Sequence, residues 1–281
     1  MEPRCRCNFV AIFLDLCKLE RWECALGTAL LHYTAAAATD RGRKRPSNQD
    51  AAGYSIEQGI YVLCDGMGGA AAGEVASSTA VQETMSLFFE RAPGAPAVEA
   101  AENAVHAANQ AVFSRSQRER RLRGMGTTLV AIFVDEQRAW VFNIGDSRCY
   151  LLRGRRLRQV SRDHSLVAEQ VREGRIGSAE ALRSPYRNVI TRALGTHKNV
   201  EADVFEVQTE PGDLFLLCSD GLTRELDDFL IEGILRQELP LGELCSRLIA
   251  AANKAGGHDN ITCLLARAGV DGSNASRAES E

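Results

Sequence analysis

Four aspartates beside apolar stretches, far apart in the sequence, could together bind metal ions. The stretches are 60–64, 140–144, 214–218 and 261–265, and the aspartates are Asp65, Asp146, Asp220 and Asp259. Aspartate is a poor strand residue, and a buried carboxylate without a partner is costly. If these acids converge, they form an all-oxygen site of the kind that hard divalent cations prefer.

Such a site is suited to in-line attack on phosphorus. Two metal ions roughly 3.5–4 Å apart, sharing a carboxylate, lower the pKa of a water molecule and neutralise phosphoryl oxygens. An arginine would complete a phosphate clamp, because its planar guanidinium matches phosphate oxygens. For any one Asp-Gly pair a turn is the commoner explanation. The set of four, with its flanking sequences, favours the metal site.

Groups of strands and helices are expected to position these acids. β-Branched and aromatic runs predict strands at 60–64, 129–134, 139–144, 149–152, 157–160, 204–207, 214–218 and 261–266. Apolar periodicity predicts helices over 74–90, 97–117, 165–173 and 241–255. Gly154 marks the turn of a hairpin, and Gly256-Gly257 ends the last helix. Short links between consecutive strands favour an antiparallel β-sandwich covered by helices over a βαβ alternation.

A series of short motifs runs in order from about residue 38 to residue 267. They are Thr39-Asp40-Arg41-Gly42 with Arg45-Pro46-Ser47-Asn48-Gln49-Asp50, Asp65-Gly66-Met67-Gly68-Gly69, Gly124-Met125-Gly126-Thr127-Thr128, Gly145-Asp146-Ser147-Arg148, Asp163-His164-Ser165, Arg187-Asn188-Val189-Ile190-Thr191-Arg192-Ala193-Leu194-Gly195, Pro211-Gly212-Asp213, Ser219-Asp220-Gly221-Leu222 and Gly257-His258-Asp259-Asn260. One such motif would be weak, but the ordered series is highly specific. The chain resembles the metal-dependent serine/threonine protein phosphatases of type 2C, in their bacterial form.

The resemblance implies a fold and an activity. The fold is α+β, with an antiparallel β-sandwich flanked by helices on both faces in four layers. The activity is hydrolysis of phosphoserine and phosphothreonine on proteins, by direct attack of water activated at a binuclear Mn²⁺ or Mg²⁺ centre. The implied partners are phosphorylated proteins that a serine/threonine kinase produces.

The resemblance also assigns roles to single residues of this sequence. Asp65 would bridge the two ions, with Gly66 offering a carbonyl oxygen to one, and Asp220 and Asp259 would bind the other. Asp146 would hold a third ion together with Asp220. Arg45 would bind the substrate phosphate. Several residues would support the metal ligands: Gln49, Asp50, Asn260, Thr127 and Thr128. The stretch 166–188 would be a mobile flap beside the cleft.

Two positions depart from the family pattern. The family usually has glutamate where this chain has Gln49, and that glutamate contacts a metal through water. Because the amide carries no charge, we expect one metal ion to bind more weakly here. Eukaryotic relatives have a histidine, proposed as the general acid, where this chain has Met67, which cannot donate a proton. His164 could replace it, but we favour a structural histidine near the start of helix 165–173, with Asp163 as the N-cap.

Composition excludes several other classes of protein. The 281 residues are 45% hydrophobic and 25% charged, with a net charge of −4, which argues against general nucleic-acid binding. The basic clusters 41–45 and 118–123 are local exceptions, and we interpret the second as solvated surface. There is no P-loop lysine, no dinucleotide fingerprint and no G-x-S-x-G elbow. Cys64 and Cys218 lie in apolar runs that disfavour a thiolate.

The expected domain organisation has three parts. Residues 1–31 are an extension of uncertain role, 32–268 form the phosphatase domain, and 269–281 are a disordered tail. Nine cysteines, several inside apolar runs, do not suggest a disulfide framework, so we expect a monomer in a reducing cytoplasm. The spacing of four N-terminal cysteines lacks a C-x-x-C pair and does not favour zinc: Cys5, Cys7, Cys17 and Cys24.

The N-terminal apolar stretch 9–16 predicts neither an export signal nor an anchor. It contains Asp15 and is too short to span a bilayer. The alternative to an enzyme is a catalytically silent phosphatase fold that binds phosphoproteins or senses a signal. All of the acids and the arginine that hydrolysis needs are present, which favours the enzyme.

Overall fold

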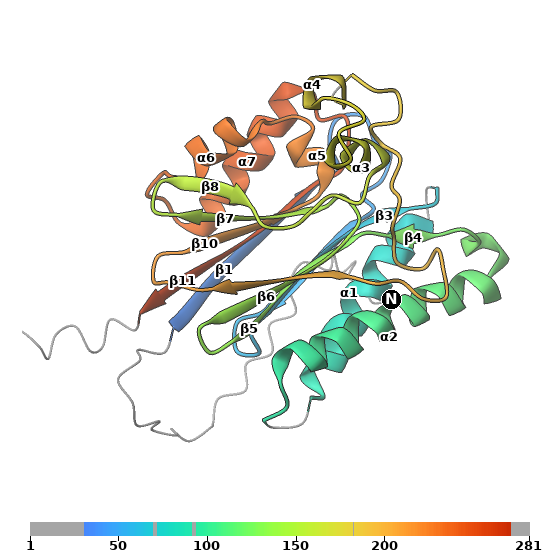
Figure 1. Ribbon diagram of the computed structural model, residues 1–281, viewed down its shortest axis with the longest axis horizontal. Coiled ribbons are helices and arrows are strands. Elements are labelled where there is room, and N and C mark those ends of the chain that lie inside the picture. Colours follow the sequence, from blue (N-terminus) through green and yellow to red (C-terminus); the bar gives the residue numbers. More distant parts are fainter. Residues whose placement is uncertain (1–30, 70–71, 92–93, 182, 271–281) are drawn as a thin grey trace, which may run out of the picture.

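Eleven strands form two antiparallel sheets in the computed structural model, which describes residues 31–69, 72–91, 94–181 and 183–270 (Figure 1). The strands are β1 (Leu31–Asp40), β2 (Asp50–Ser55), β3 (Ile60–Met67), β4 (Gly126–Thr127), β5 (Leu129–Asp135), β6 (Arg138–Ile144), β7 (Arg148–Arg153), β8 (Arg156–Gln159), β9 (Asp203–Gln208), β10 (Leu214–Cys218) and β11 (Ile261–Val270). One sheet has the order β1-β11-β10-β7-β8. The other has the order β2-β3-β5-β6-β9, with the short β4 paired to β3.

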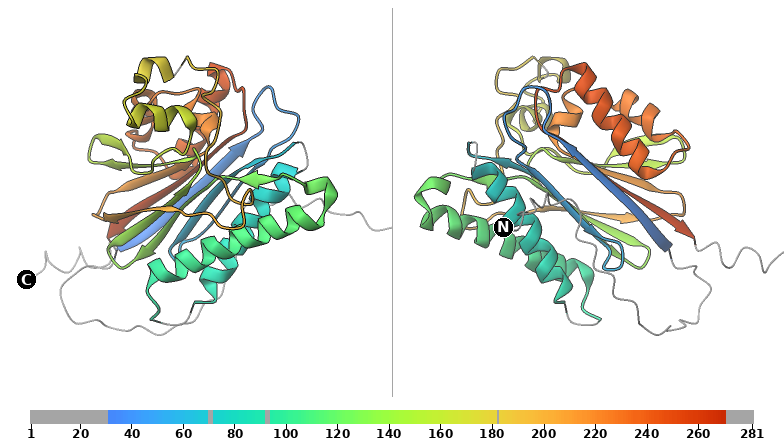
Figure 2. Two further views of the ribbon diagram at one scale, coloured as in Figure 1. Left: turned by 45° about the vertical axis from the view of Figure 1, so that its right-hand side comes forward. Right: turned by 180° about the vertical axis from the view of Figure 1, so that it is seen from behind.

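Helices cover the outer face of each sheet (Figures 1 and 2). The helices of the described residues are α1 (Ala72–Phe89), α2 (Ala97–Arg118), the short η1 (Arg120–Leu122), α3 (Leu166–Arg172), α4 (Ser178–Ala181), α5 (Asp220–Thr223), α6 (Asp228–Leu235) and α7 (Leu241–Ala255), of which α3 and α4 lie at one end of the sandwich. The long pair α1 and α2 lies against the sheet that contains β3, and α6 and α7 lie against the sheet that contains β10. The predicted four-layer α+β sandwich is therefore confirmed.

The apolar core has one layer between the sheets and one beneath each pair of helices. Tyr61 and Phe215 are fully buried between the two sheets. Phe133, also fully buried, points to the opposite side of its sheet and packs against Phe88 of α1, with 4.7 Å between the ring centroids. This alternation of side chains along β3 and β5 gives their sheet two apolar faces.

The first and last described strands pair along their whole length. β1 runs antiparallel to β11 from Leu31 opposite Val270 to Asp40 opposite Ile261. The sheet therefore reaches beyond the expected domain limits, since Leu31, Gly269 and Val270 belong to strands. The other residues assigned to the extension and the tail, including the four N-terminal cysteines, lie outside the described residues.

Two glycines lie where the sequence predicted a hairpin turn and a helix end. Gly154 has φ +60° in the β7–β8 hairpin, and Gly257 has φ +56° just beyond α7. The expected cap of α3 is wrong. Ser165, not Asp163, is the N-cap, and its hydroxyl accepts a hydrogen bond from the Ala168 amide. Asp163 instead forms an ion pair with Arg148 at 2.7 Å.

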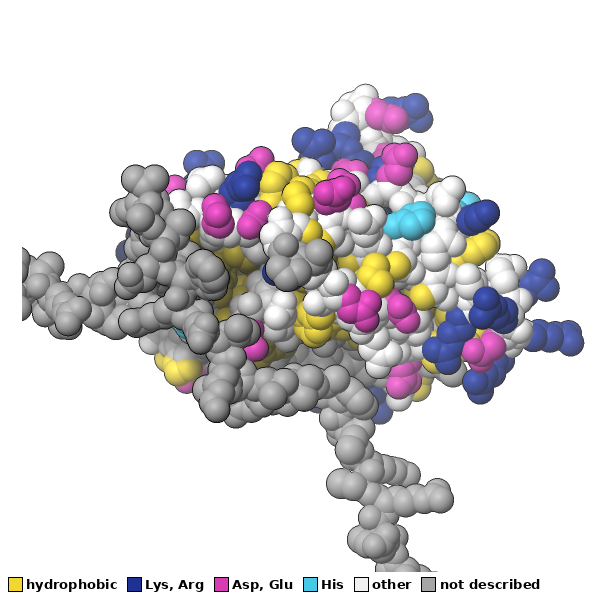
Figure 3. Space-filling view, turned by 90° about the horizontal axis from the view of Figure 1, so that it is seen from below, with side chains coloured by type: hydrophobic (Ala, Val, Ile, Leu, Met, Phe, Trp, Pro, Cys, Tyr) yellow, Lys and Arg dark blue, Asp and Glu magenta, His cyan; other side chains and the backbone are white. Residues whose placement is uncertain are grey.

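The surface and the thiols agree with the expected class of protein. Figure 3 shows Lys and Arg side chains gathered at one end of the face that it presents. In the basic cluster 118–123, Arg121 forms an ion pair with the neighbouring Glu119, as on ordinary solvated surface. The five cysteines in the described part of the chain are free and buried. None of the helices in that part could cross a membrane.

Candidate metal centre and phosphate site

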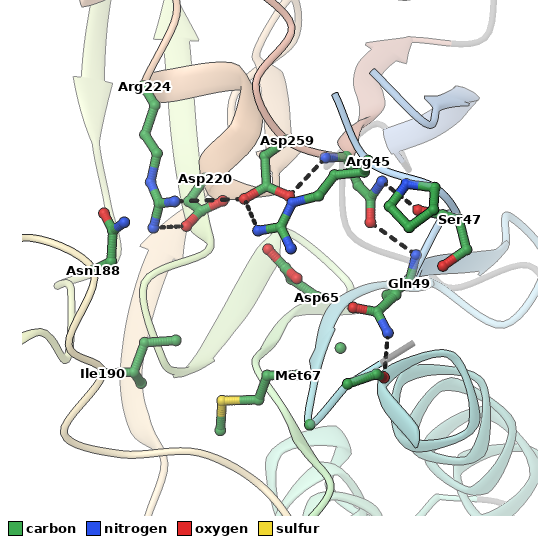
Figure 4. A pocket seen from close by; sticks show the side chains of 15 residues that line it. Arg45, Ser47, Gln49, Asp65, Met67, Asn188, Ile190, Asp220, Arg224 and Asp259 are labelled. Atoms are coloured by element: carbon green, nitrogen blue, oxygen red, sulfur yellow. Dashed lines mark hydrogen bonds and ion pairs between the residues drawn. The ribbon is translucent and has the colours of Figure 1, made fainter. Parts of the chain in front are cut away.

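Three of the four aspartates meet at one cavity of about 420 Å³, at the end of the sandwich where β3 ends and α5 begins (Figure 4). Asp65 lies near the end of β3, Asp220 is the first residue of α5, and Asp259 lies two residues before β11. Two strands and a helix start thus bring together acids that are up to about 200 residues apart in the sequence. The convergence that the sequence suggested is present.

Close main-chain contacts fix where these acids stand. A Cβ on Gly221 would lie 1.9 Å from the carbonyl oxygen of Asn260, so the segments that carry Asp220 and Asp259 touch through their backbones. A Cβ on Gly66 would lie 2.0 Å from the carbonyl oxygen of Gly73. Only glycine fits at these two positions. The spacing of the acids is therefore set by the backbone and not by side-chain conformations.

Two threonines hold the backbone of Asp65 in place. The Thr128 hydroxyl accepts a hydrogen bond from the Asp65 amide at 2.9 Å. The Thr127 hydroxyl donates to the Asp65 carbonyl at 2.8 Å. Both polar groups of the Asp65 backbone are thus satisfied, which leaves its carboxylate directed into the cavity in Figure 4.

Asn260 ties the loop before β2 to the segment of Asp259. Its side-chain amide donates to the carbonyl oxygens of Arg41 and Ser47, at 2.9 Å each. The side-chain oxygen of Asn260 accepts a hydrogen bond from the backbone amide of Gln49 at 2.9 Å. The predicted supporting role of Asn260 therefore consists of holding the loop that carries Arg45 beside the acids.

Asp50 lies behind the cavity, directly opposite Asp65 in the β2–β3 register. Its Oδ2 accepts hydrogen bonds from the hydroxyls of Ser219 and Thr262, at 2.8 and 2.7 Å. Burial raises the pKa of Asp50 to about 6, even though these two hydrogen bonds oppose the shift. Asp50 thus links both sheets just beneath the acids that face the cavity.

Burial and mutual repulsion raise the free-energy cost of ionising these carboxyl groups when no cation is beside them. Burial, followed by the charges of Asp50, Asp220 and Asp146, raises the pKa of Asp65 well above its usual value. Burial also raises the pKa of Asp220, with Arg224 opposing. Burial and the charge of Asp220 raise the pKa of Asp146 to about 7. A bound cation would relieve this cost.

Two arginines form ion pairs with the acids. Arg45 Nη2 lies 2.8 Å from Asp259 Oδ2, and its side chain is half exposed to the cavity. Arg224, which sequence reasoning missed, forms an ion pair with Asp220 and reaches within 3.5 Å of Asp259. The sequence does contain a signal for this pair, because Asp220 and Arg224 have the i,i+4 spacing of a helical ion pair.

The acids do not by themselves form a finished coordination shell. Within the described ranges, no group of three or more His, Cys, Asp and Glu side chains is arranged to hold a metal ion. Their chemistry nevertheless fits a divalent cation. Three buried carboxylate oxygens lack a hydrogen-bond partner: Oδ1 of Asp50, of Asp146 and of Asp220. Unpaired carboxylate oxygens beside Asp65 are the donors that Mn²⁺ and Mg²⁺ prefer.

The two unusual positions both line the cavity. The side-chain amide of Gln49 donates a hydrogen bond to the Gly69 carbonyl at 2.7 Å, which a glutamate could not do. Met67 lies at the cavity wall in Figure 4. The cavity lining includes no histidine, so the general acid of the eukaryotic relatives has no counterpart among these residues.

His164 is a structural residue, as favoured from the sequence. It is 2% exposed and does not line the cavity. Its Nδ1 accepts a hydrogen bond from the Gly145 amide at 3.1 Å, and its Nε2 lies 3.3 Å from Asp203 Oδ2. Burial, helped by the charge of Arg192, lowers the pKa of His164, so it stays neutral at neutral pH.

The expected flap overhangs the cavity at its C-terminal end. Asn188 lines the cavity, and so does Ile190 just beyond the flap (Figure 4). Tyr186 is 60% exposed beside them. Gly174, just after α3, has φ +69°, a backbone conformation that glycine adopts without steric cost. The flap therefore contributes directly to the wall that a substrate would touch.

The raised pKa values predict how the metal-free protein responds to pH. The folded state holds extra protons on Asp50 and Asp146 between their ordinary value of 3.8 and about 6 and 7. The free energy of unfolding should therefore fall as the pH rises through that window, by about 1.4 kcal/mol per pH unit for each extra proton. Thermal melts in a chelator at several pH values measure this fall.

Manganese should remove this pH dependence, because it binds the ionised carboxylates. The Asp146→Asn variant is the control, since it should give a shallower fall than the wild type in the same chelator. A metal-free protein whose stability rises from about pH 5 to about pH 7 would contradict the linkage.

Comparison with known protein families and sequences points to one kind of enzyme. The model of the family described as protein phosphatase 2C matches residues 39–266. The serine/threonine phosphatase stp of Listeria monocytogenes is 41% identical over 233 residues, which cover 81% of this chain and 92% of that protein. The serine/threonine protein phosphatase PstP of Mycobacterium tuberculosis is 40% identical over 242 residues, 85% of this chain and 45% of that protein.

Solved structures give the same result. A crystal structure of the Mycobacterium tuberculosis phosphatase PstP matches with a TM-score of 0.79 at 39% identity, covering 85% of this chain and 99% of that one. A structure of the PstP catalytic domain in complex with two manganese ions matches with a TM-score of 0.77 at 38% identity, with the same coverage.

Proposed function

Because this chain belongs to the protein phosphatase 2C family and is a serine/threonine protein phosphatase, we propose that it acts through a binuclear Mn²⁺ or Mg²⁺ centre. Water would attack the phosphorus of phosphoserine or phosphothreonine directly. The observation that carries this proposal is the convergence of Asp65, Asp220 and Asp259 on one cavity with Arg45. The relative in complex with two manganese ions supports the number of metal ions.

Each acid has a distinct part in holding the ions. Asp65 would help to hold both ions, and the carbonyl oxygen of Gly66 would be a further donor to one. Asp220 and Asp259 would help to hold the other. When bound, the two ions lower the pKa of a water molecule and neutralise the non-bridging oxygens of the phosphoryl group. The rigid backbone contacts at Gly66 and Gly221 keep these donors in position without reorganisation.

Arg45 supplies the clamp for the substrate phosphate. Its guanidinium lies 2.8 Å from Asp259 and remains half exposed, so it faces both the acids and solvent in the cavity. Its planar fork can donate two parallel hydrogen bonds to phosphate oxygens. Arg45 thus orients the phosphoryl group over the acids while Asp259 keeps the guanidinium from swinging away.

Protonation of the leaving serine or threonine oxygen falls to water. Met67 has no proton to donate, and His164 lies outside the cavity. Burial raises the pKa of the thiols of Cys64 and Cys218 and keeps them out of nucleophilic chemistry. These two thiols therefore do not form a covalent phosphoenzyme.

The partners of this site are phosphorylated proteins, which a serine/threonine kinase would produce. We propose that the chain acts on them as a monomer, because the three acids and the arginine assigned to the reaction all line one cavity of a single chain. The free and buried thiols of the described cysteines fit a reducing cytoplasm.

Hydrolysis of a phosphothreonine peptide during a Mn²⁺ titration tests the metal mechanism. Phosphate release should rise with Mn²⁺, fall to background in excess chelator and return when Mn²⁺ is restored. Restoration separates loss of metal from irreversible damage to the protein. Full turnover in the chelator would refute the proposed binuclear metal centre.

Gln49 predicts weaker binding of one ion than in family members with glutamate. Replacement by glutamate adds a charge near the acids, so Gln49→Glu should lower the half-saturating Mn²⁺ concentration, by up to about 10–100-fold for a residue beside a ligand. Part of the gain is offset because the variant loses the hydrogen bond to Gly69. Activity at graded Mn²⁺ concentrations measures the change.

Gln58→Glu is the matched control, since Gln58 lies at the β2–β3 turn and does not line the cavity. It adds the same charge away from the acids and should leave the half-saturating concentration unchanged. An unchanged value in Gln49→Glu as well would count against a weakened ion site.

A further inference from the structure

Arg224 extends from the end of α5 across three of the four aspartates. Its guanidinium forms an ion pair with Asp220, lies 3.5 Å from Asp259 and reaches within 3.7 Å of Asp146. Figure 4 shows the side chain directed toward Asp220 and Asp259 at one side of the cavity. A single fixed positive charge is therefore shared among acids that come from three different segments.

Asp146 differs from the other acids in its access to the cavity. It is 7% exposed and does not line the cavity, whereas Asp65, Asp220 and Asp259 all do. The charged group that approaches Asp146 from the cavity side is Arg224, at 3.7 Å. The Oδ1 atom of Asp146 is buried without a hydrogen-bond partner. An ion that approached Asp146 from the cavity would meet the positive charge of this guanidinium.

We propose that the guanidinium of Arg224 takes the place of a third metal ion between Asp146 and Asp220. The chain would then bind two ions, at Asp65, Asp220 and Asp259, and not three. The proposal rests on the proposed binuclear centre and narrows it. It concerns Arg224, which is outside the motifs that carry the family resemblance.

Charge and tethering support this assignment. A third divalent ion between Asp146 and Asp220 would stand within a few ångströms of a permanent positive charge, because arginine does not lose its proton in proteins. Arg224 is also held by its i,i+4 position relative to Asp220, on the same turn of helix. Asp220 is already assigned to the proposed binuclear centre, and Asp146 already has Arg224 within 3.7 Å as a counter-ion, so these residues do not fit a third ion.

One movement would contradict the proposal. Arg224 also lines a second cavity of about 390 Å³, which adjoins the first at Arg45 and Asn188. If the guanidinium swings into that second cavity when the first two ions bind, Asp146 becomes accessible. A third ion would then bind to the wild type.

The number of Mn²⁺ ions per chain distinguishes the two outcomes without any measurement of activity. Equilibrium dialysis of the full chain against saturating Mn²⁺, followed by elemental analysis, should give two ions for the wild type. Arg224→Ala should give three. Arg224→Lys, which keeps the positive charge, should give two.

Two further variants control for indirect effects. Arg236→Ala removes an arginine with the same i,i+4 pairing and similar exposure, 32% against 31%, but away from both cavities, and should leave two ions. Arg224→Ala/Asp146→Asn should return the count from three to two, which would place the added ion at Asp146.

Three ions in the wild type, with two in Asp146→Asn, would overturn the proposal, and so would two ions in Arg224→Ala. The wild-type and Asp146→Asn counts decide the matter even if Arg224→Ala fails to fold. A wild type that binds no ion or one ion would refute the binuclear centre itself. The difference of one ion between Arg224→Ala and the wild type would still report on Arg224.

Discussion

The Asp65→Asn variant should lose nearly all Mn²⁺-dependent hydrolysis of a phosphothreonine peptide. Asp65 contributes the carboxylate proposed to bridge both ions, and an amide cannot replace its charge. The loss in kcat/KM should at least reach the roughly 10²–10³-fold that follows removal of one transition-state-stabilising group. The fold should survive, because Thr127 and Thr128 hold the backbone of this residue and not its side chain.

Asp227→Asn is the matched control for this experiment. Asp227 is also an aspartate at the start of a helix, but it caps α6 away from the cavity, where its side chain accepts a hydrogen bond from the Leu230 amide. Since asparagine caps nearly as well, activity and melting temperature should both stay close to wild type. Normal turnover by a folded Asp65→Asn protein would refute the bridging role.

The Phe133→Ala variant should be destabilised by about 3–5 kcal/mol. Phe133 is fully buried under α1, between Phe88 and Phe142, with ring centroids 4.7 and 5.2 Å away. Its removal leaves a cavity that neighbouring rings cannot fill. Because domains are stable by only about 5–15 kcal/mol, much of the folded population is at risk.

Urea unfolding followed by circular dichroism measures this loss. Phe229→Ala is the control, because Phe229 is 82% exposed on α6 and its removal creates no cavity. We expect a change within about 0.5 kcal/mol for that variant. Equal stability losses in the two variants would contradict the assignment of Phe133 to the core.

The strands that could be predicted are those whose own residues favour β structure. β5 and β6 read as strands because they are rich in β-branched and aromatic residues. β1 did not, since Ala35 to Ala38 are small and carry little strand preference. Its position depends on ten residue pairs with β11, more than 200 residues later. Information of that range cannot be read from local composition.

The helices show a similar limit. The sheet-facing side of α1 is not marked by its large apolar residues alone. Its fully buried positions include Ala76, Ala80 and Phe88, in line at intervals of four or eight residues, while Val75 and Leu87 are only half-buried. Small residues let the helix approach the sheet closely, and hydrophobicity alone underrates them. The short helices α5 and α6 are too brief for periodicity to show.

The candidate site was predicted better than the elements around it. Its acids lie in short motifs whose meaning is local, so Asp65, Asp220 and Asp259 could be named before any fold was known. The cap of α3 could not be predicted, because it depends on a choice between partners. Asp163 pairs with Arg148 across the sheet, which leaves Ser165 to cap the helix.

The pairing of β1 with β11 has a consequence for the order of events during protein synthesis. β11 lies between β1 and β10, and Asp259 stands two residues before it. Until this segment has left the ribosome, one sheet lacks an interior strand and the catalytic cavity lacks an acid. If Asp259 binds a metal ion as proposed, a growing chain should therefore not hydrolyse phosphoproteins until β11, the last described strand, is in place.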